Sequence, residues 1–358
     1  MNRTFVIAEA GVNHNGSLDL AKELIKRAAE AGADAVKFQT FTAASIISRH
    51  AEKADYQKKN TGSEESQLEM VRRLELSEAM HEEIVACCRE NCIQFLSSPF
   101  DSESVDLLAN KIRVDQIKIP SGEITNAPLL LKVAQTGLPV LLSTGMATLG
   151  EIEEALGVLA FGYVNKNGSP SMANFQNAYV SNDGQNALQS KVTLLHCTTE
   201  YPSPFEEVNL KAMDTLKAAF QLRVGFSDHT EGIAIPIVAV GRGATVIEKH
   251  FTIDRTLPGP DHKASLEPQE LKAMITAIRQ VELAVGSGIK RPSPTEQKNK
   301  EIVRKSLVAG RVINRGEMFS EANLACKRPG TGVSPMKYWE FLGKQADRSY
   351  TPDEKIER

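Results

Sequence analysis

Residues that can bind anions or metal ions lie within, or shortly after, several short apolar segments of this chain. Two lysines, Lys37 and Lys118, occupy such positions. Four serines do so as well: Ser98, Ser121, Ser143 and Ser227. Ammonium and hydroxyl groups hold phosphates and carboxylates through charge-assisted hydrogen bonds. The alternative is that the lysines pair with Glu9 and Glu123 and that each serine only packs, but the recurrence favours a site for an anionic ligand.

Two histidines, His229 and His250, accompany the last two apolar segments and are the candidate metal ligands. If these segments are adjacent strands, a divalent cation can bridge the two imidazoles, with Glu9, Glu123 and Asp261 nearby. Two imidazoles alone would leave the site open to water or substrate oxygens, which suits Mn²⁺, or Mg²⁺ in its place. The alternative is a pair of hydrogen-bonded core histidines.

The remaining histidines carry weaker predictions. His14 lies in an Asn-His-Asn-Gly segment and is expected to belong to a turn that supports the site. His196 is expected either to support the site from behind or to be an ordinary core residue. His50 and His81 are expected to be solvent-exposed.

Strand-like and helix-like segments alternate to about residue 286 and would position these groups. The expected strands are Thr4–Ala10, Ala33–Thr40, Ile93–Ser97, Gln116–Ile119, Pro139–Ser143, Val192–Cys197, Arg223–Phe226 and Ala244–Phe251. Each precedes a segment with helical periodicity, the last being Pro268–Val285. Eight such units predict a (β/α)8 barrel with its chemistry at the carboxyl ends of the strands. A doubly wound open sheet is the competitor, but no GxGxxG follows the first strand.

Three other stretches interrupt or follow this pattern. The polar segment 41–70 follows the second strand and should form a loop on the active-site face. The Asn-, Gly- and Ser-rich segment 162–190 is expected to be a surface elaboration without chemistry. Residues 287–301 are a predicted polar linker, and 302–358, with short apolar runs and frequent Gly and Pro, are predicted to form a small β-rich domain.

Composition narrows the class of protein. The 358 residues carry a formal net charge of −3, which argues against nucleic acid or an anionic membrane as partner. No run of 18 apolar residues occurs, and the N-terminus lacks the features of a signal peptide. The five cysteines form no CxxC pair, which is typical of a cytoplasmic protein.

Several long motifs resemble the sialic acid synthase family. They include AEAGVNHNGSLDLAKELIKRAAEAGADAVKFQTF, KIPSGE, LLSTGM, LLHCTTEYPSPFEEVNL, GFSDHT, EKHFT and GPDHKASLEP. KRPGTGVSP near the C-terminus resembles the antifreeze-like (SAF) domain of that family. The resemblance implies condensation of phosphoenolpyruvate with an N-acylated amino-mannose, and a domain-swapped homodimer in which each small domain caps the partner's barrel.

The resemblance also implies roles for individual residues. His229 and His250 would hold manganese, and Glu9 or Glu123 would orient the sugar or transfer a proton. Phosphoenolpyruvate would be bound by Lys37, Ser98, Lys118, Ser121, Ser143 and Ser227. The sugar would be bound by Gln39, Asn60, Tyr201, Asp261 and Arg328.

The main functional expectation is the synthesis of N-acetylneuraminate and phosphate from N-acetylmannosamine and phosphoenolpyruvate. In this reaction carbon 3 of phosphoenolpyruvate attacks the open-chain aldehyde, and phosphate leaves by C–O cleavage. The alternative is N,N'-diacetyllegionaminate synthesis from 2,4-diacetamido-2,4,6-trideoxymannose. Two remoter possibilities are a Schiff-base lyase that uses a desolvated lysine and a binding module built on the small domain.

Overall fold

The computed structural model describes residues 3–48, 51, 66–165 and 168–357. Its contacts divide the chain into two units, Met1–Gly286 and Ser287–Arg358. The first unit contains one sheet of eight parallel strands. These are β1 (Phe5–Gly11), β2 (Ala35–Thr40), β3 (Gln94–Pro99), β4 (Ile117–Ile119), β5 (Val140–Ser143), β6 (Val192–His196), β7 (Arg223–Asp228) and β8 (Val246–His250).

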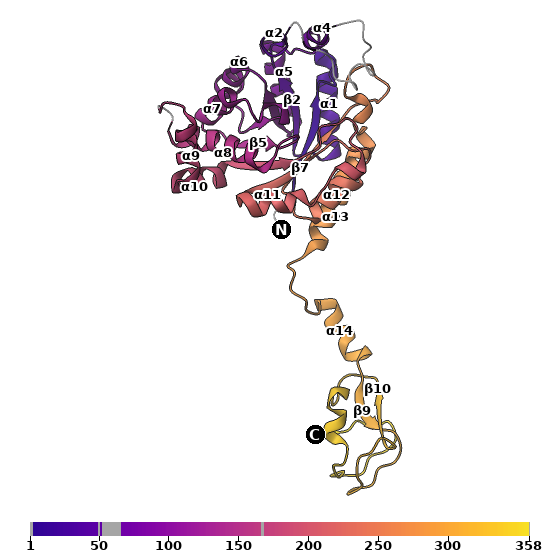
Figure 1. Cartoon of the computed structure of the whole chain (residues 1–358). Coiled ribbons are helices and arrows are strands. Elements are labelled where there is room, and N and C mark those ends of the chain that lie inside the picture. The colour runs from indigo at the N-terminus through magenta and orange to yellow at the C-terminus, as the bar shows by residue number, and fades with distance from the viewer. Residues whose placement is uncertain (1–2, 49–50, 52–65, 166–167, 358) are drawn as a thin grey trace. The chain divides into compact units, whose positions relative to one another are not determined.

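The order of strands in this sheet is β3-β2-β1-β8-β7-β6-β5-β4. The two end strands, β3 and β4, also lie against each other, so the sheet closes into a barrel surrounded by helices (Figure 1). The predicted barrel is therefore confirmed, and the open-sheet alternative is excluded. All eight predicted strands are present, with ends that differ by at most two residues.

Helices follow the strands, and most of them cover the outside of the barrel. They are α1 (Leu18–Ala31), α2 (Ala43–Ile46), α4 (Gln67–Arg72), α5 (Glu78–Glu90), α6 (Ser102–Asp106), the π-helix η1 (Leu107–Ile112), α7 (Ala127–Gln135), α8 (Leu149–Val164), α9 (Met172–Val180), α10 (Asn182–Lys191), α11 (Ala212–Phe220), α12 (Ala234–Gly241) and α13 (Pro268–Val285). Short 3₁₀ turns are η2 (Ser121–Glu123), η3 (Phe205–Glu207) and η4 (His262–Ala264).

Helix α1 shows how local sequence sets these elements. The Ser17 side chain accepts a hydrogen bond from the Leu20 amide and caps the N-terminus. Gly32 ends the helix at φ 89°, a left-handed conformation that favours glycine. Residues three and four apart, such as Leu24 and Ala28, are buried against the barrel.

Alternation along the strands builds two layers inside the barrel. An apolar layer at the amino-terminal side consists of Ile7, Ala35, Leu96, Leu141, Leu195 and Val246. Successive inward positions are two residues apart in a strand, so Glu9 lies above Ile7 and Lys37 above Ala35. The same spacing places a second, polar layer above the apolar one, toward the carboxyl ends of the strands.

A buried ion pair joins β7 and β8 on the outer side of this polar layer. The Lys249 ammonium lies 2.6 Å from Asp228 Oδ2, and both side chains are fully buried. Asp228 Oδ1 also accepts hydrogen bonds from the amide and hydroxyl of Thr230. The pair thus ties together the two strand ends that precede His229 and His250.

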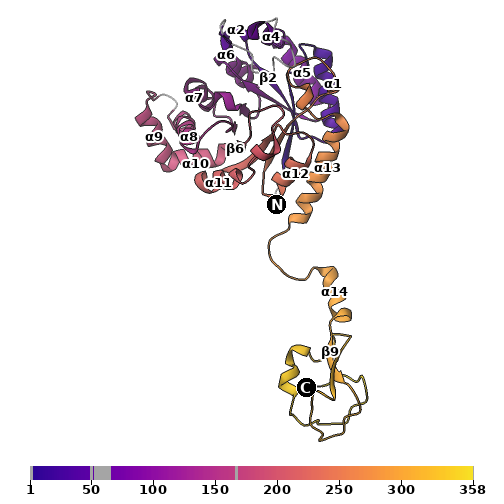
Figure 2. The same cartoon turned by 45° about the vertical axis from the view of Figure 1, so that its right-hand side comes forward.

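One prediction about this unit is wrong, that for His81, while segment 162–190 is more regular than its composition suggests. Helices α9 and α10 lie within this segment and pack on α8 (Figure 2). Ser171 and Ser181 cap these helices, while Phe175 and Ala178 are buried. His81 is fully buried rather than exposed, since its Nε2 lies 2.9 Å from Thr40 Oγ1 and its Nδ1 lies 2.9 Å from the Ser77 carbonyl oxygen. His50 lies outside the described residues.

The second unit has its own core. It begins with α14 (Pro294–Val303), which overlaps the predicted linker, and has an antiparallel pair, β9 (Ser306–Ala309) and β10 (Leu324–Lys327). The 3₁₀ turn η5 (Pro335–Lys337) and α15 (Tyr338–Phe341) complete it. Its core consists of Leu307, Ala309, Ile313, Phe319, Leu324, Ala346, Tyr350 and Ile356.

Candidate active site

A cavity of about 400 Å³ opens at the carboxyl ends of the barrel strands. Thirteen of the fifteen predicted site residues line it. They are Glu9, Lys37, Gln39, Ser98, Lys118, Ser121, Glu123, Ser143, Tyr201, Ser227, His229, His250 and Asp261. Of the other two, Asn60 lies outside the described residues and Arg328 belongs to the second unit.

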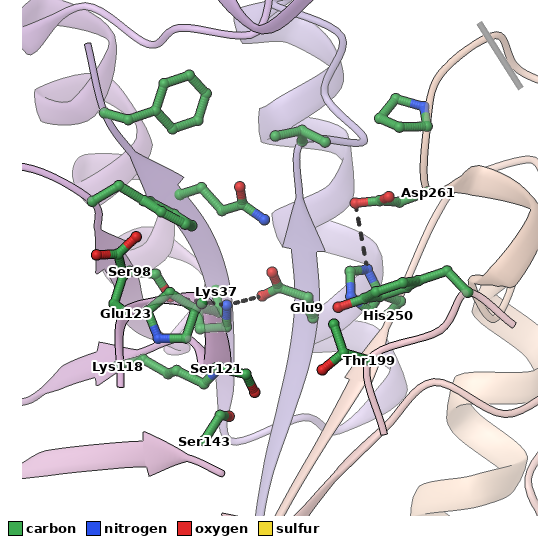
Figure 3. Close-up of a pocket in the computed structure, with 18 of the residues that line it drawn as sticks. Glu9, Lys37, Ser98, Lys118, Ser121, Glu123, Ser143, Thr199, His250 and Asp261 are labelled. Carbon is green, nitrogen blue, oxygen red and sulfur yellow. Dashed lines mark hydrogen bonds and ion pairs between the residues drawn. The ribbon is translucent and has the colours of Figure 1, made fainter. Parts of the chain in front are cut away.

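The base of the cavity holds two lysines and two carboxylates at close range. Lys37 Nζ lies 2.8 Å from Glu9 Oε2 and donates a hydrogen bond of 3.2 Å to Ser98 Oγ (Figure 3). Lys118 Nζ lies 3.2 Å from Glu248 Oε1, to which Ser227 donates a hydrogen bond of 2.8 Å. Each lysine thus has a carboxyl partner within the protein, which holds it in place before any ligand binds.

Glu248 joins the two halves of this base and was not among the predicted site residues. Its second oxygen lies 3.8 Å from Lys37 Nζ, so both lysines face one carboxylate. Burial alone would raise the pKa of Glu248, but Lys118 and Lys37 outweigh it and lower the pKa to about 2. The only signal in the sequence was that Glu248 lies two residues before His250, on the same face of β8.

Glu9 differs from Glu248 in its electrostatic surroundings. Burial raises its pKa to about 7, although Lys37 opposes the shift. Asp261 behaves in the same way, with burial raising its pKa to about 6. Glu123 is only half-buried, and its Oε2 accepts a 2.6 Å hydrogen bond from the Asn126 amide.

Hydroxyl groups surround the lysines from other strands. Ser143 Oγ is buried and has no hydrogen-bond partner among the described residues. Ser121 Oγ accepts a 3.0 Å hydrogen bond from the Gly145 amide and lies 3.1 Å from Cys197 Sγ. A buried hydroxyl without a partner is costly, so Ser143 is well placed to donate to an oxygen-rich ligand.

His229 and His250 meet beside this base. Their ring centroids are 5.3 Å apart, and the Tyr201 ring lies 4.2 Å from that of His229. His229 Nδ1 lies 2.6 Å from the Thr198 carbonyl oxygen, a contact that leaves Nε2 as the acceptor nitrogen. Burial lowers the pKa of both histidines, that of His229 to about 4, so both are neutral at pH 7.

These two rings fit a divalent cation that takes most of its ligands from elsewhere. His250 Nδ1 is buried without a hydrogen bond, and the nearest carboxylate oxygen, Asp261 Oδ2, is 4.0 Å away. No group of three or more His, Cys, Asp or Glu side chains in the described part of the chain is arranged to hold a metal ion. The protein would therefore supply the two imidazoles and leave other positions to oxygen ligands.

The outer part of the cavity is apolar on one side, a feature that the sequence patterns did not indicate. Val12, Phe41 and Phe100 directly follow β1, β2 and β3 and line it. Such residues resemble ordinary core positions in the sequence. His14 and His196 do not line it, since His14 accepts a hydrogen bond from the Gly16 amide and His196 contacts the Val208 carbonyl oxygen.

No helix within residues 3–48, 66–165 and 168–357 has both the length and the apolar character needed to span a membrane.

Comparisons with known proteins agree with this geometry. A family model described as the NeuB family matches residues 24–290. The N,N'-diacetyllegionaminic acid synthase of Campylobacter jejuni is 57% identical over 356 residues, which are 99% of this chain and 99% of that protein. The enzyme of the same name from Legionella pneumophila is 45% identical over 341 residues, 95% of this chain and 90% of that protein.

A solved structure extends the likeness to three dimensions. The N-acetylneuraminic acid synthetase of Leptospira borgpetersenii superposes with a TM-score of 0.67 at 34% identity, covering 83% of this chain and 90% of that chain. The resemblance of the barrel motifs to the sialic acid synthase family is thereby confirmed. Since the family model and both synthases match most of its length, this chain is an enzyme and belongs to the NeuB family.

Proposed function

We propose that this enzyme condenses phosphoenolpyruvate with 2,4-diacetamido-2,4,6-trideoxymannose to give N,N'-diacetyllegionaminate and phosphate. The observation that carries this proposal is the 57% identity, across 99% of both chains, to a synthase of that name. The comparisons thus favour the alternative of the sequence analysis over the main expectation, N-acetylneuraminate. N-acetylneuraminate remains the second candidate, because the superposed protein from Leptospira borgpetersenii, which is 34% identical to this chain, is an N-acetylneuraminic acid synthetase.

The charged base is the proposed site of phosphoenolpyruvate. Lys37 and Lys118 would exchange part of their contact with Glu9 and Glu248 for the phosphate and carboxylate of the ligand. The hydroxyls of Ser98, Ser121, Ser143 and Ser227 would supply further donors. Holding the enol carbon next to the aldehyde lowers the barrier through proximity and orientation.

The two imidazoles are the proposed ligands of Mn²⁺, or of Mg²⁺ in its place. A bound cation would act as a Lewis acid toward the sugar aldehyde. His229 and His250 are neutral and so are ready to bind a metal without losing a proton. The Thr198 carbonyl fixes the orientation of the His229 ring.

Glu9 is the proposed proton-transfer group, and Glu123 is proposed to orient the sugar. Glu9 lies in the buried base beside Lys37, and its raised pKa suits proton transfer near neutral pH. Glu123 is bound by Asn126 at the half-buried edge of the cavity. Gln39, Tyr201 and Asp261 line the same space and would complete the sugar site.

We assign the second unit the role of an antifreeze-like lid in a domain-swapped homodimer. The support is the KRPGTGVSP motif, which contains Arg328, the proposed sugar contact from the partner's small domain. Asn60 is proposed as a further sugar contact. A cytoplasmic location is proposed as well, because the five cysteines form no CxxC pair.

A substrate comparison tests the proposal. Phosphate release from phosphoenolpyruvate is measured with 2,4-diacetamido-2,4,6-trideoxymannose and with N-acetylmannosamine, and the first sugar should give the higher kcat/KM. The reverse order would replace the proposal with the N-acetylneuraminate reaction. Trapping with borohydride in the presence of pyruvate should give no adduct, because both lysines are paired with carboxylates; a covalent adduct would instead show Schiff-base chemistry.

A further inference from the structure

An apolar cluster separate from the barrel core lines one side of the cavity mouth. Its members, here named the apolar wall, are Val12, Phe41, Ile46, Val71, Leu74 and Phe100. All six line the cavity that holds the charged base. The rings of Phe41 and Phe100 meet edge to face, with centroids 6.0 Å apart. The cluster therefore forms one continuous surface facing the ligand space.

The strand register places this wall farther out than the charged base. Val12 lies three residues beyond Glu9, Phe41 lies four beyond Lys37, and Phe100 lies two beyond Ser98. At about 3.3 Å per residue of extended chain, these offsets of two to four residues correspond to about 7–13 Å along the strand direction. Polar residues line other parts of the cavity, among them Glu123 after β4, Asp261 after β8 and Gln67 on α4.

We infer that the apolar wall is a specificity subsite for the C6 methyl group of the sugar. This inference rests on the proposed function, which places the aldehyde C1 beside the histidines and the enol at the charged base. Carbon 6 is the end of the sugar chain farthest from C1, so it extends outward to the level of the wall. The acetamido groups need hydrogen-bond partners and belong to the polar parts of the cavity.

The wall discriminates against a hydroxyl at C6 because it offers no side-chain partner for one. All six of its side chains are hydrocarbon. A hydroxymethyl group pressed against them loses hydrogen bonds to water without replacement, whereas a methyl group gains apolar contact. Apolar pockets reject an added hydroxyl by about 10–100-fold, which sets the size of the expected preference.

Two matched pairs of sugars isolate this effect in the wild-type enzyme. The first pair is 2,4-diacetamido-2,4,6-trideoxymannose and 2,4-diacetamido-2,4-dideoxymannose. The second is 2-acetamido-2,6-dideoxymannose and N-acetylmannosamine. The members of each pair differ only in the 6-hydroxyl. The 6-deoxy sugar should have the higher kcat/KM in each pair, by about 10–100-fold.

Substitutions then locate the preference on the wall. Ile46 and Val71 are half-buried and line the cavity, so Ile46→Thr and Val71→Thr each place a hydroxyl in the wall. Val71→Thr replaces a methyl group at nearly equal volume, whereas Ile46→Thr replaces an ethyl group. Each should reduce the preference within a pair at least about threefold, with an unchanged KM for phosphoenolpyruvate. Leu68→Thr is the matched control, because Leu68 is half-buried on the same helix as Val71 but does not line the cavity.

The outcomes separate this inference from the proposed function. Equal turnover of the two sugars within each pair would overturn the wall assignment while leaving the condensation reaction intact. The wall assignment would also be overturned if Ile46→Thr and Val71→Thr changed the preference no more than Leu68→Thr does. Absence of phosphate release with all four sugars would overturn the proposed function and, with it, this inference.

Discussion

The charged base and the apolar wall of one cavity differ in charge, in polarity and in the elements that form them. The base is assembled from inward positions of the barrel strands, where Lys37 and Lys118 are held by Glu9 and Glu248. The wall is assembled from residues that follow the strands, from the short helices α2 and α4, and from Leu74 just after α4. The base suits an anion that any phosphoenolpyruvate-using relative must bind, whereas the wall suits one class of sugar. The residues proposed to carry the reaction and those proposed to select the sugar therefore lie in separate layers of the cavity.

Removal of divalent cations is expected to have the largest effect on turnover. Exhaustive treatment with EDTA should lower phosphate release by about 1,000-fold or more, because Lewis-acid stabilisation contributes several kcal/mol. Added Mn²⁺ should restore it. Metal analysis by mass spectrometry should show bound metal in the wild type and much less in His250→Asn. Full turnover of verified metal-free protein would contradict the assignment of the two imidazoles.

The two glutamates should respond differently to loss of charge. Glu9→Gln is expected to lower kcat by about 100-fold or more, as for loss of a proton-transfer group. Glu123→Gln is expected mainly to raise the KM for the sugar, by about tenfold, through one lost hydrogen bond. Steady-state phosphate release with each substrate varied in turn measures both effects. Equal, modest losses in the two variants would remove the proton-transfer role from Glu9.

The ion pair behind the base should matter for stability. Lys249→Met leaves Asp228 charged in a fully buried position, so it is expected to cost about 3–5 kcal/mol in free energy of unfolding. The double variant with Asp228→Asn should recover part of this loss. Far-UV circular dichroism reports mainly the helical barrel, while fluorescence of the single tryptophan, Trp339, reports the second unit.

Only the circular dichroism transition should therefore shift in Lys249→Met. Lys272→Met, an exposed position on α13, serves as the control. A loss below about 1 kcal/mol would show that water or relaxation compensates the orphaned carboxylate.

Residues of the base were predictable because a parallel barrel imposes a simple rule. A strand has a period of two, so Lys37 and Gln39 share a face, as do Glu248 and His250. Carboxyl ends of the strands meet at one rim, which brings Glu9, Ser143 and Ser227 together. The role of Glu248 was missed because it depends on the register between strands, which places two lysines from β2 and β4 beside it.

Features that depend on tertiary contacts were not predictable. The apolar wall consists of residues whose types are typical of a core, and only the fold turns them toward a ligand cavity. His81 lies on a charged helix, yet its ring is hydrogen-bonded to Thr40 of β2, a strand far away in sequence. Segment 162–190 has a loop-like composition, but Phe175 packs against Phe161 of α8 and stabilises helices there.

Measurement of sugar selectivity and phosphoenolpyruvate KM in one series of variants tests the separation of layers most directly. Lys118→Met should lower kcat/KM by about 100-fold for a 6-deoxy sugar and its 6-hydroxyl partner alike, because it weakens only the anion site. Val71→Thr should change the ratio between the two sugars and leave the KM for phosphoenolpyruvate unchanged. A shifted sugar ratio in Lys118→Met, or a raised phosphoenolpyruvate KM in Val71→Thr, would contradict the account.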